Sequence, residues 1–572
     1  MRSSDRSLPT ARSELAEALS RCRSAFMSVG LFSALINVLM LTGPFFMLQI
    51  YDRVLPSRSV ATLLGFAILV IILYTFQAIL EGIRGRVLIR VGASLDEALS
   101  ERVYSLISRI PLLSRGNAGD GMQPVRDLDQ IRSFLSGSGM AAMFDLPWIP
   151  LYLGLCFLFH PLIGLAAVIG GALLFGITLL AEIMTRKPAS QAAELGAARN
   201  ALLEASRRNA EAVQAMGMGG RLASRWGETN RAYQQTQRRT YDVVGGLGTL
   251  SRMLRFLIQS IVLGIGAYLV IRQDASPGVI IASSILVSRA LAPVELAIAN
   301  WKGLVAARQA WARLKHMLAM LPSTGTPLAL PKPEGALTVE NVVAVPPGDA
   351  HIVVRDVSFA LPAGNALGII GPSASGKSSL ARLLVGVWQP ARGRVCLDGA
   401  SLDQWTPESL GAHIGYLPQS VELFAGTVAE NISRFETDAD PDAVIAAAKA
   451  AGVHELILGL TDGYDTEIGE AGTVLSAGQR QRIALARALY GDPFLVVLDE
   501  PNANLDEEGD RALTAAIHSV RERGGVVVVI AHRPSALAAA DLVLLLLNGR
   551  PERFGPKSKV LQGLVHPAAA AE

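Results

Sequence analysis

Six long apolar blocks constrain the fold of this 572-residue chain more than any other feature. They cover residues 25–50, 60–80, 140–159, 162–181, 256–271 and 278–299, and hold very few charged residues. A bilayer core about 30 Å thick needs about 20 apolar residues in a helix to span it. We therefore predict six membrane-spanning helices, at about 25–50, 60–82, 140–159, 161–182, 251–272 and 277–300. The alternative, helices buried in a large soluble core, is disfavoured because such helices seldom run this long without charges.

The composition excludes other classes of protein. Hydrophobic residues make up 51% of the chain and charged residues only 18%, against about 25% charged in ordinary soluble proteins. This excludes a disordered chain, which needs low hydrophobicity and high charge. A net charge of +3 is too small to indicate nucleic-acid binding, so we expect no nucleic-acid partner.

The placement of arginine predicts the orientation. Short turns at 51–59, 160–161 and 272–277 join the blocks into three hairpins, whereas long polar stretches at 81–139 and 182–255 connect the hairpins. Arginines gather in the N-terminal tail and the long stretches, and the short turns hold few. By the positive-inside rule, the tail, the long stretches and the C-terminal half are cytoplasmic.

The C-terminal half carries a phosphate-binding pattern. A strand-like run, 367–370, precedes the pattern G-x-x-x-x-G-K-S, and a helix-like run follows it. In this context the backbone N–H groups curl around phosphates, the lysine reaches the β- and γ-phosphates and the serine binds Mg²⁺. The predicted ATP-binding residues are Gly371, Pro372, Ser373, Ala374, Ser375, Gly376, Lys377, Ser378 and Ser379.

Further motifs of the same half complete a nucleotide site. A second strand-like run ends in Asp499 and Glu500, which suit a magnesium-shell carboxylate and a group that polarises the attacking water. A third runs into His532, which is placed to touch the γ-phosphate. A small turn before a helix, Leu475–Gln479, is a second anion site at a helix N-terminus.

Together these motifs resemble the nucleotide-binding domain of ATP-binding cassette (ABC) transporters. The resemblance implies a Walker A loop at 371–378, a catalytic set of Glu500, His532 and Gln419, a D-loop Asp506, and Mg²⁺ held through Ser378, Gln419 and Asp499. It further implies a head-to-tail dimer, in which the signature residues contact ATP held by the other chain. Those signature residues are Leu475, Ser476, Ala477, Gly478 and Gln479.

The chain departs from the family pattern in three places. Ala477 and Ala374 stand where the family usually has glycine, and the segment 343–348 holds no aromatic ring to stack on adenine. Because Glu500 and His532 are both present, we expect an active ATPase. A half-transporter of this kind requires two copies, and we favour a homodimer over a pair of different half-transporters.

The expected architecture is an α-helical six-helix exporter domain, with long cytoplasmic helical extensions, fused to an α/β P-loop domain. We expect a cytoplasmic segment at 1–24, the transmembrane domain at 25–320, a linker at 321–335 and the nucleotide-binding domain at 336–572. The passages 43–58 and 144–152 resemble the protease and lipase export branch of type I secretion transporters.

That second resemblance implies ATP-driven secretion of unfolded polypeptide across the inner membrane of a Gram-negative bacterium. The implied partners are a periplasmic membrane-fusion adaptor, an outer-membrane channel and the secreted polypeptide, with membrane lipid around the helices. Export of lipid or of small amphipathic molecules is the alternative for the same fold. A soluble ABC ATPase is disfavoured by the six apolar blocks.

Two charges in the sixth block mark a possible translocation path. Arg289 and Glu295 lie within an apolar run, and a charge in mid-bilayer costs about 2.5–3.5 kcal/mol on insertion scales, so it usually faces a polar pathway. We predict that both line the route of the cargo, with Pro293 bending the helix. The alternative places them near the cytoplasmic end, paired with neighbouring chains.

Overall fold

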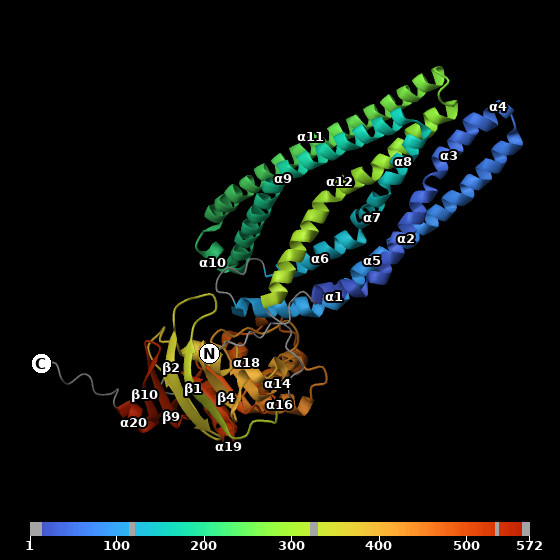
Figure 1. Ribbon diagram of the computed structural model, residues 1–572. Helices are drawn as coiled ribbons and strands as arrows, with labels where there is room; N and C mark the ends of the chain where they lie inside the picture. The colour runs from blue at the N-terminus through green and yellow to red at the C-terminus, as the bar shows by residue number, and fades with distance from the viewer. Residues whose placement is uncertain (1–13, 114–120, 321–329, 532–536, 563–572) are drawn as a thin grey trace, which may run out of the picture. The chain divides into compact units, whose positions relative to one another are not determined.

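The computed structural model describes residues 14–113, 121–320, 330–531 and 537–562. The chain divides into two compact units, which follow one another in sequence near residue 322. The first is helical and the second is a mixed α/β domain (Figure 1).

Among the residues that the structure describes, six helices of the first unit are long and apolar enough to cross a membrane, which agrees with the predicted number of spans. Its elements are α1 (Glu14–Arg21), α2 (Arg23–Leu39), α3 (Thr42–Gln49), the π-helical turn η1 (Ile50–Val54), α4 (Leu55–Ser57), α5 (Val60–Leu113), α6 (Gln123–Ser136), α7 (Ser138–Asp145), the 3₁₀ turn η2 (Leu146–Trp148), α8 (Ile149–Phe159), α9 (Pro161–Arg208), α10 (Ala210–Ala215), α11 (Gly219–Ile271) and α12 (Pro277–Met320).

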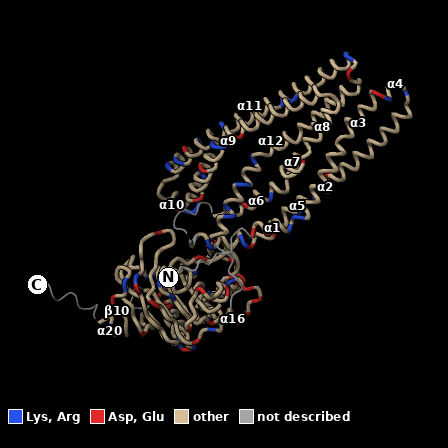
Figure 2. Tube along the Cα trace, in the orientation of Figure 1, with Lys and Arg blue, Asp and Glu red and all other residues tan. Residues whose placement is uncertain are grey.

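The polar stretches between hairpins continue the membrane helices. Helix α5 has 54 residues, which at 1.5 Å per residue gives about 80 Å, far more than a bilayer core. Helices α9 and α11 run side by side (Figure 1), and their charged residues lie mostly toward the end that adjoins α10 (Figure 2). Helix α12 continues through Pro293 to Met320.

A buried polar cluster joins the first three spans. Arg84 of α5 donates to both carboxylate oxygens of Asp145, at 2.9 and 3.1 Å. Asn37 of α2 donates to the same carboxylate at 2.8 Å. Tyr152 of α8 is fully buried, and its hydroxyl donates to the side-chain oxygen of Asn37 at 2.9 Å. The cluster satisfies polar groups that would be costly in an apolar interior.

A single carboxylate ties the first hairpin to the sixth span. Asp52 lies in η1, and its side chain accepts the backbone N–H of Gly278 at 2.8 Å and the hydroxyl of Ser276 at 2.5 Å. These bonds satisfy donors at the start of α12, where helical N–H groups have no partner within the helix. The space is tight, because a Cβ on Gly278 would lie 2.7 Å from the Asp52 carboxyl group.

In the part of the second unit that the structure describes, the strands form two sheets. Its strands are β1 (Ala336–Ala344), β2 (Val354–Pro362), β3 (Ala366–Ile370), β4 (Arg392–Leu397), β5 (Ala400–Ser401), β6 (Ile414–Leu417), β7 (Leu495–Asp499), β8 (Val526–Ile530), β9 (Leu542–Leu547) and β10 (Arg550–Pro556). One sheet is antiparallel, in the order β2-β1-β4-β5. The other has the order β10-β9-β3-β8-β7-β6, parallel except at the β10 edge.

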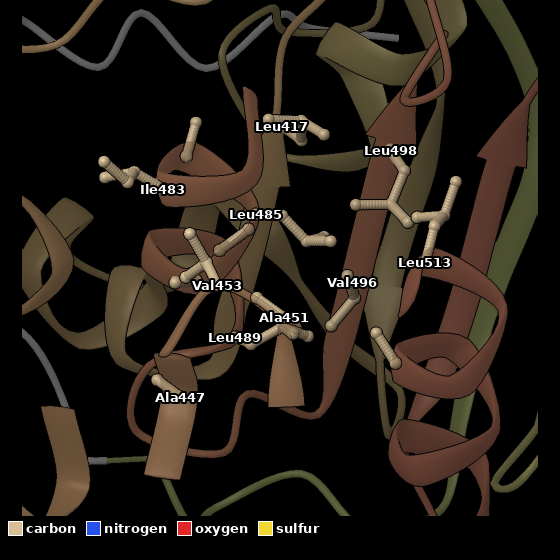
Figure 3. Packing of buried hydrophobic residues seen from close by; sticks show 14 of the residues in the cluster. Leu417, Ala447, Ala451, Val453, Ile483, Leu485, Leu489, Val496, Leu498 and Leu513 are labelled. Atoms are coloured by element: carbon tan, nitrogen blue, oxygen red, sulfur yellow. The ribbon is translucent and has the colours of Figure 1, made fainter. Parts of the chain in front are cut away.

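The helices of the second unit pack on its sheets or on one another. They are α13 (Lys377–Leu384), α14 (Pro407–His413), α15 (Val428–Ile432), α16 (Pro441–Ala450), α17 (His454–Leu458), α18 (Ala477–Leu489), α19 (Glu507–Glu522) and α20 (Lys557–Gln562). Figure 3 shows Leu485 of α18 and Leu513 of α19 beside Val496 and Leu498 of β7. Because the central strands are covered by side chains on both faces, they read as unbroken apolar runs.

Candidate nucleotide-binding site

The site begins at the carboxyl ends of three adjacent parallel strands. Strand β8 pairs with β3 on one side and β7 on the other. The predicted phosphate loop follows β3, and Asp499 and Glu500 stand at the end of β7. In open α/β sheets, ligands bind at this edge of the strands. The fold therefore brings the loop and the two carboxylates to one edge.

Residues 371–376 form the loop between β3 and α13. The Nζ atom of Lys377 donates to the carbonyls of Gly371 and Pro372, at 3.0 and 2.8 Å. Its ammonium group therefore lies over the loop. Burial lowers the pKa of Lys377, and the carboxylates of Glu500 and Asp499 partly oppose this.

Two loop glycines are required by close contacts. A Cβ on Gly371 would lie 2.2 Å from the carbonyl oxygen of Leu546, and one on Gly376 would lie 2.5 Å from that of Val353. Gly376 also has a φ of +95°, in the region that glycine adopts without strain. Between them, Ala374 adopts a φ of 65°, so this alanine holds the left-handed conformation that glycine favours.

Asp499 is a buried carboxylate with spare bonding capacity. The residue is 2% exposed, and its Oδ1 atom is buried without a hydrogen-bond partner. Burial raises the pKa of Asp499, which the hydrogen bond from Ser378 partly offsets. An unpaired buried carboxylate oxygen beside a serine hydroxyl suits a divalent cation, which prefers oxygen ligands.

Glu500 is held in a left-handed backbone conformation directly after β7. Its φ is 53°, and its N–H donates to the carbonyl of Ile530, at the end of β8, at 2.9 Å. Non-glycine residues in this region are uncommon, and they cluster at functional sites. The side chain of Glu500 is thereby placed at the strand end, next to Asp499.

The signature segment caps α18. The hydroxyl of Ser476 accepts the N–H of Gln479 at 3.3 Å, and the side chain of Gln479 accepts the N–H of Ser476 at 2.8 Å. This reciprocal pair is a capping box. A Cβ on Gly478 would lie 3.0 Å from the carbonyl of Asn504, whereas Ala477 fits as the first residue of the helix.

Two buried polar residues that the sequence analysis missed connect α18 to the segment after Glu500. The amide of Gln481 donates to the carbonyl of Pro501 and accepts the N–H of Asn504, the latter at 3.1 Å. Arg482 donates to Asp506 at 2.5 Å. The signal available in the sequence was their place within two turns of the signature motif.

The remaining predicted residues are placed as follows. Gln419 is exposed, two residues after Leu417, the residue of β6 that pairs with Leu498 of β7. Asp506 caps α19 by accepting the N–H of Gly509 at 2.8 Å. His532 lies outside the described residues.

The two charges of the sixth span differ in their surroundings. Glu295 forms an ion pair with Arg255 of α11, 3.0 Å between Nε and Oε1, and both side chains are about three-quarters buried. Arg289, on the same helix α12, is exposed. Glu295 is thus paired with a neighbouring helix of its own chain, and a role of Arg289 and Glu295 in the path of the cargo stays a prediction.

Two family models match the chain. Residues 354–503 match that of the ABC transporter, and residues 26–293 match that of the ABC transporter transmembrane region. The chain is also similar in fold to a bacterial Atm1-family ABC exporter with ATP bound, with a TM-score of 0.80 and 23% identity, over 96% of this chain and 99% of that one. The likeness to this solved structure shows the fold alone.

Curated relatives match nearly the whole chain. The "Type I secretion system ATP-binding protein PrsD" of Rhizobium meliloti (strain 1021) is 58% identical over 552 residues, which are 96% of this chain and 95% of that protein. The "Alpha-hemolysin translocation ATP-binding protein HlyB" of Escherichia coli is 28% identical over 548 residues, 95% of this chain and 77% of that protein.

Proposed function

This chain belongs to the ABC transporters of type I secretion systems, and on that basis we propose that it exports unfolded polypeptide from the cytoplasm at the expense of ATP. The observation that carries the proposal is the fusion, in one chain, of a nucleotide site to six membrane-spanning helices, matched along 96% of its length by a type I secretion protein. The chain is a multi-pass membrane protein with an ATPase domain.

The ATPase site is assigned to residues at the ends of β3 and β7. Lys377 and the loop N–H groups would bind the phosphates of ATP, and Glu500 would polarise the attacking water. The two carbonyls that now accept from Lys377 are backbone groups of the loop itself, so the lysine can transfer its hydrogen bonds to phosphate. The predicted roles of Gln419 and His532 complete the assignment.

Mg²⁺ fits the same site. Ser378, Asp499 and Gln419 would hold it, and the buried Oδ1 of Asp499 without a partner supports this choice. When bound, the ion neutralises charge on the β- and γ-phosphates and so favours phosphoryl transfer to water.

A homodimer would complete the site. The signature segment 475–479 lies at the N-terminus of α18, where helical N–H groups can bind phosphate, and the second copy would supply it to ATP bound by the first. Asp506 and Arg482 link that segment to the residues that follow Glu500, so the two halves of a site are mechanically connected within each chain.

The proposed setting is the inner membrane of a Gram-negative bacterium. The arginine-rich tail and extensions and the nucleotide-binding domain would lie in the cytoplasm, by the positive-inside rule. A periplasmic adaptor, an outer-membrane channel and a secreted polypeptide are the partners, as in type I secretion. The membrane lipids would surround the exposed apolar side chains of the six spans.

Deletion of the gene in its own bacterium tests the function. We expect one or more proteins to disappear from the culture medium and to return when the wild-type chain is restored. The variant Glu500→Gln should not restore them, whereas Glu522→Gln, at an exposed position on α19, serves as the control. If the set of secreted proteins is unchanged and lipid export is altered instead, the chain is a lipid exporter and the proposal is wrong.

A further inference from the structure

A polar cavity lies among four helices of the first unit. It measures about 350 Å³ and is lined by residues of α6, α9, α11 and α12. Three of these residues are cations, Arg126, Arg199 and Lys302. Among the described residues that line it, none is an aspartate or a glutamate. A cavity of this size falls within the range of about 300–1,000 Å³ typical of ligand pockets.

Two of its cations are held by neutral groups. The guanidinium of Arg199 lies 4.5 Å from the centre of the Tyr233 ring and donates to the side-chain oxygen of Asn200 at 3.3 Å. The ammonium of Lys302 lies 5.5 Å from the centre of the Tyr241 ring. Such contacts orient a cation over an aromatic face without neutralising its charge.

The carboxylate of Asp127, which is close to the cavity, already has hydrogen-bond partners. Gln123 of the cavity donates to Asp127 at 2.8 Å. Both oxygens of Asp127 also accept from Arg313, at 2.6 and 3.0 Å. Asp127 is buried and both of its oxygens bond to the half-exposed Arg313, which leaves it little capacity to balance the cavity cations, so the cavity keeps a positive potential.

The cavity lies outside the apolar part of its helices. On α9 its lining begins at Ala189 and extends to Asn200, whereas the apolar run ends near Ala181. At 1.5 Å per residue, this places the lining about 12–29 Å beyond that end. Figure 2 shows charged residues on α9 and α11 toward the end that adjoins α10. The surroundings therefore favour a water-borne ligand over a bilayer lipid.

We propose that this cavity binds acidic side chains of the exported polypeptide before they enter the membrane. Arg199 would receive a carboxylate through its planar guanidinium, and Lys302 would act as a point charge. The size of the cavity admits a few side chains of an extended segment and excludes a folded domain. The proposal rests on the export of unfolded polypeptide and names the chemistry of the cargo segment that is bound first.

Binding of three labelled peptides to the full-length dimer in lipid nanodiscs tests this proposal. The peptides alternate glycine with aspartate, asparagine or lysine, and their affinities are measured by fluorescence anisotropy without nucleotide. We expect the aspartate peptide to bind at least about tenfold more tightly than the asparagine peptide, a difference of about 1.4 kcal/mol. Equal affinities for the three peptides would overturn the proposal, as would displacement of the aspartate peptide by ATP or an anionic lipid alone.

Charge reversal keeps the test valid if a simple loss variant folds poorly. The double variant Arg199→Glu/Lys302→Glu should prefer the lysine peptide to the aspartate peptide. Control variants on the same helices, Arg208→Glu and Lys315→Glu, lie outside the lining and should keep the wild-type preference. An unreversed preference in the cavity variant would contradict the assignment.

The role of the cavity and the export of polypeptide are measured separately. Secretion by cells carrying the charge-reversed variant reports on the cavity, and secretion by wild-type cells reports on polypeptide export. Unchanged export of an acidic cargo by the variant overturns the proposed role of the cavity and leaves the export function standing. Wild-type cells that secrete no protein, with peptide selectivity intact, overturn the export function alone.

Discussion

The guanidinium of Arg84 and the carboxylate of Asp145 are joined by two hydrogen bonds, of 2.9 and 3.1 Å, between helices whose apolar runs cross the membrane. Their side chains are 12% and 9% exposed. Ser33 and Asn37 of α2 complete the cluster with further hydrogen bonds to Arg84 and Asp145. The first three spans are thereby held by one charge pair.

Removing one member of this pair should destabilise the protein more than removing both. Breaking a buried pair costs about 3–5 kcal/mol because a charge is left without its partner. We expect Arg84→Met to lower the unfolding temperature of the purified transporter strongly, and Arg84→Met/Asp145→Leu to recover part of the loss. Arg86→Met, at an exposed position two residues along the same helix, is the control. A double variant less stable than either single one would show that the pair is not the source of the effect.

Ala374 should tolerate glycine but not valine. Its φ of 65° costs an L-residue roughly 1–2 kcal/mol, and a β-branched side chain adds further strain. Ala374→Gly should therefore keep ATP affinity within about twofold, since glycine adopts this backbone conformation without strain. Ala374→Val should weaken ATP binding at least about tenfold. Ala391→Val, at an exposed loop position, controls for the added methyl groups, and isothermal titration gives the affinities.

Glu500→Gln should retain ATP and lose turnover. The glutamine keeps the shape of the side chain and the hydrogen bond from the Glu500 N–H to Ile530, but it cannot accept a proton from water. Loss of a general base lowers rates by about 10²–10⁴-fold. Phosphate release and filter-bound ATP, measured on the same samples, separate the two effects. Multiple turnovers at the wild-type rate would remove Glu500 from its assigned role.

Asp499→Asn should stabilise the nucleotide-free protein while abolishing its response to Mg²⁺. Burial raises the pKa of Asp499 above its ordinary value of 3.8, so its ionisation costs stability. That cost is absent below the ordinary pKa and grows as the pH rises through the raised one. We expect a gain of about 1–3 kcal/mol near neutral pH, the usual penalty of an unsatisfied buried group.

The measurement is thermal unfolding between pH 4 and pH 8, with and without MgATP. The advantage of the Asp499→Asn variant should shrink toward pH 4, and MgATP should stabilise only the wild type. A constant difference at all pH values would mean that charge is not the cause. Asp492→Asn, at an exposed carboxylate, is the matched control.

The sequence predicted the parts of the fold that depend on local pattern. The six spans could be predicted because a bilayer requires long uncharged runs, and the phosphate loop because the pattern G-x-x-x-x-G-K-S stands between a strand-like run and a helix-like run. Such requirements act on consecutive residues. They are therefore visible without knowledge of the rest of the chain.

The parts that could not be predicted depend on partners far apart in sequence. Asp145 was visible as a lone charge in the third block, but its partner lies 61 residues away on α5. The partner of Glu295 in the ion pair, Arg255 of α11, was not visible from the sequence, and the predicted role of Glu295 in the path is untested. The left-handed backbone of Ala374 and of Glu500 is set by the surrounding strands, and their side chains carry no signal of it.

The contact of Asp52 with the start of α12 has a consequence for biosynthesis. Asp52 leaves the ribosome 224 residues before Ser276, which at about 5–20 residues per second is about 11–45 s. During that interval Asp52 has been made but its partners have not. The contact can form only after Ser276 and Gly278 have been synthesised, so it closes the membrane domain late in translation.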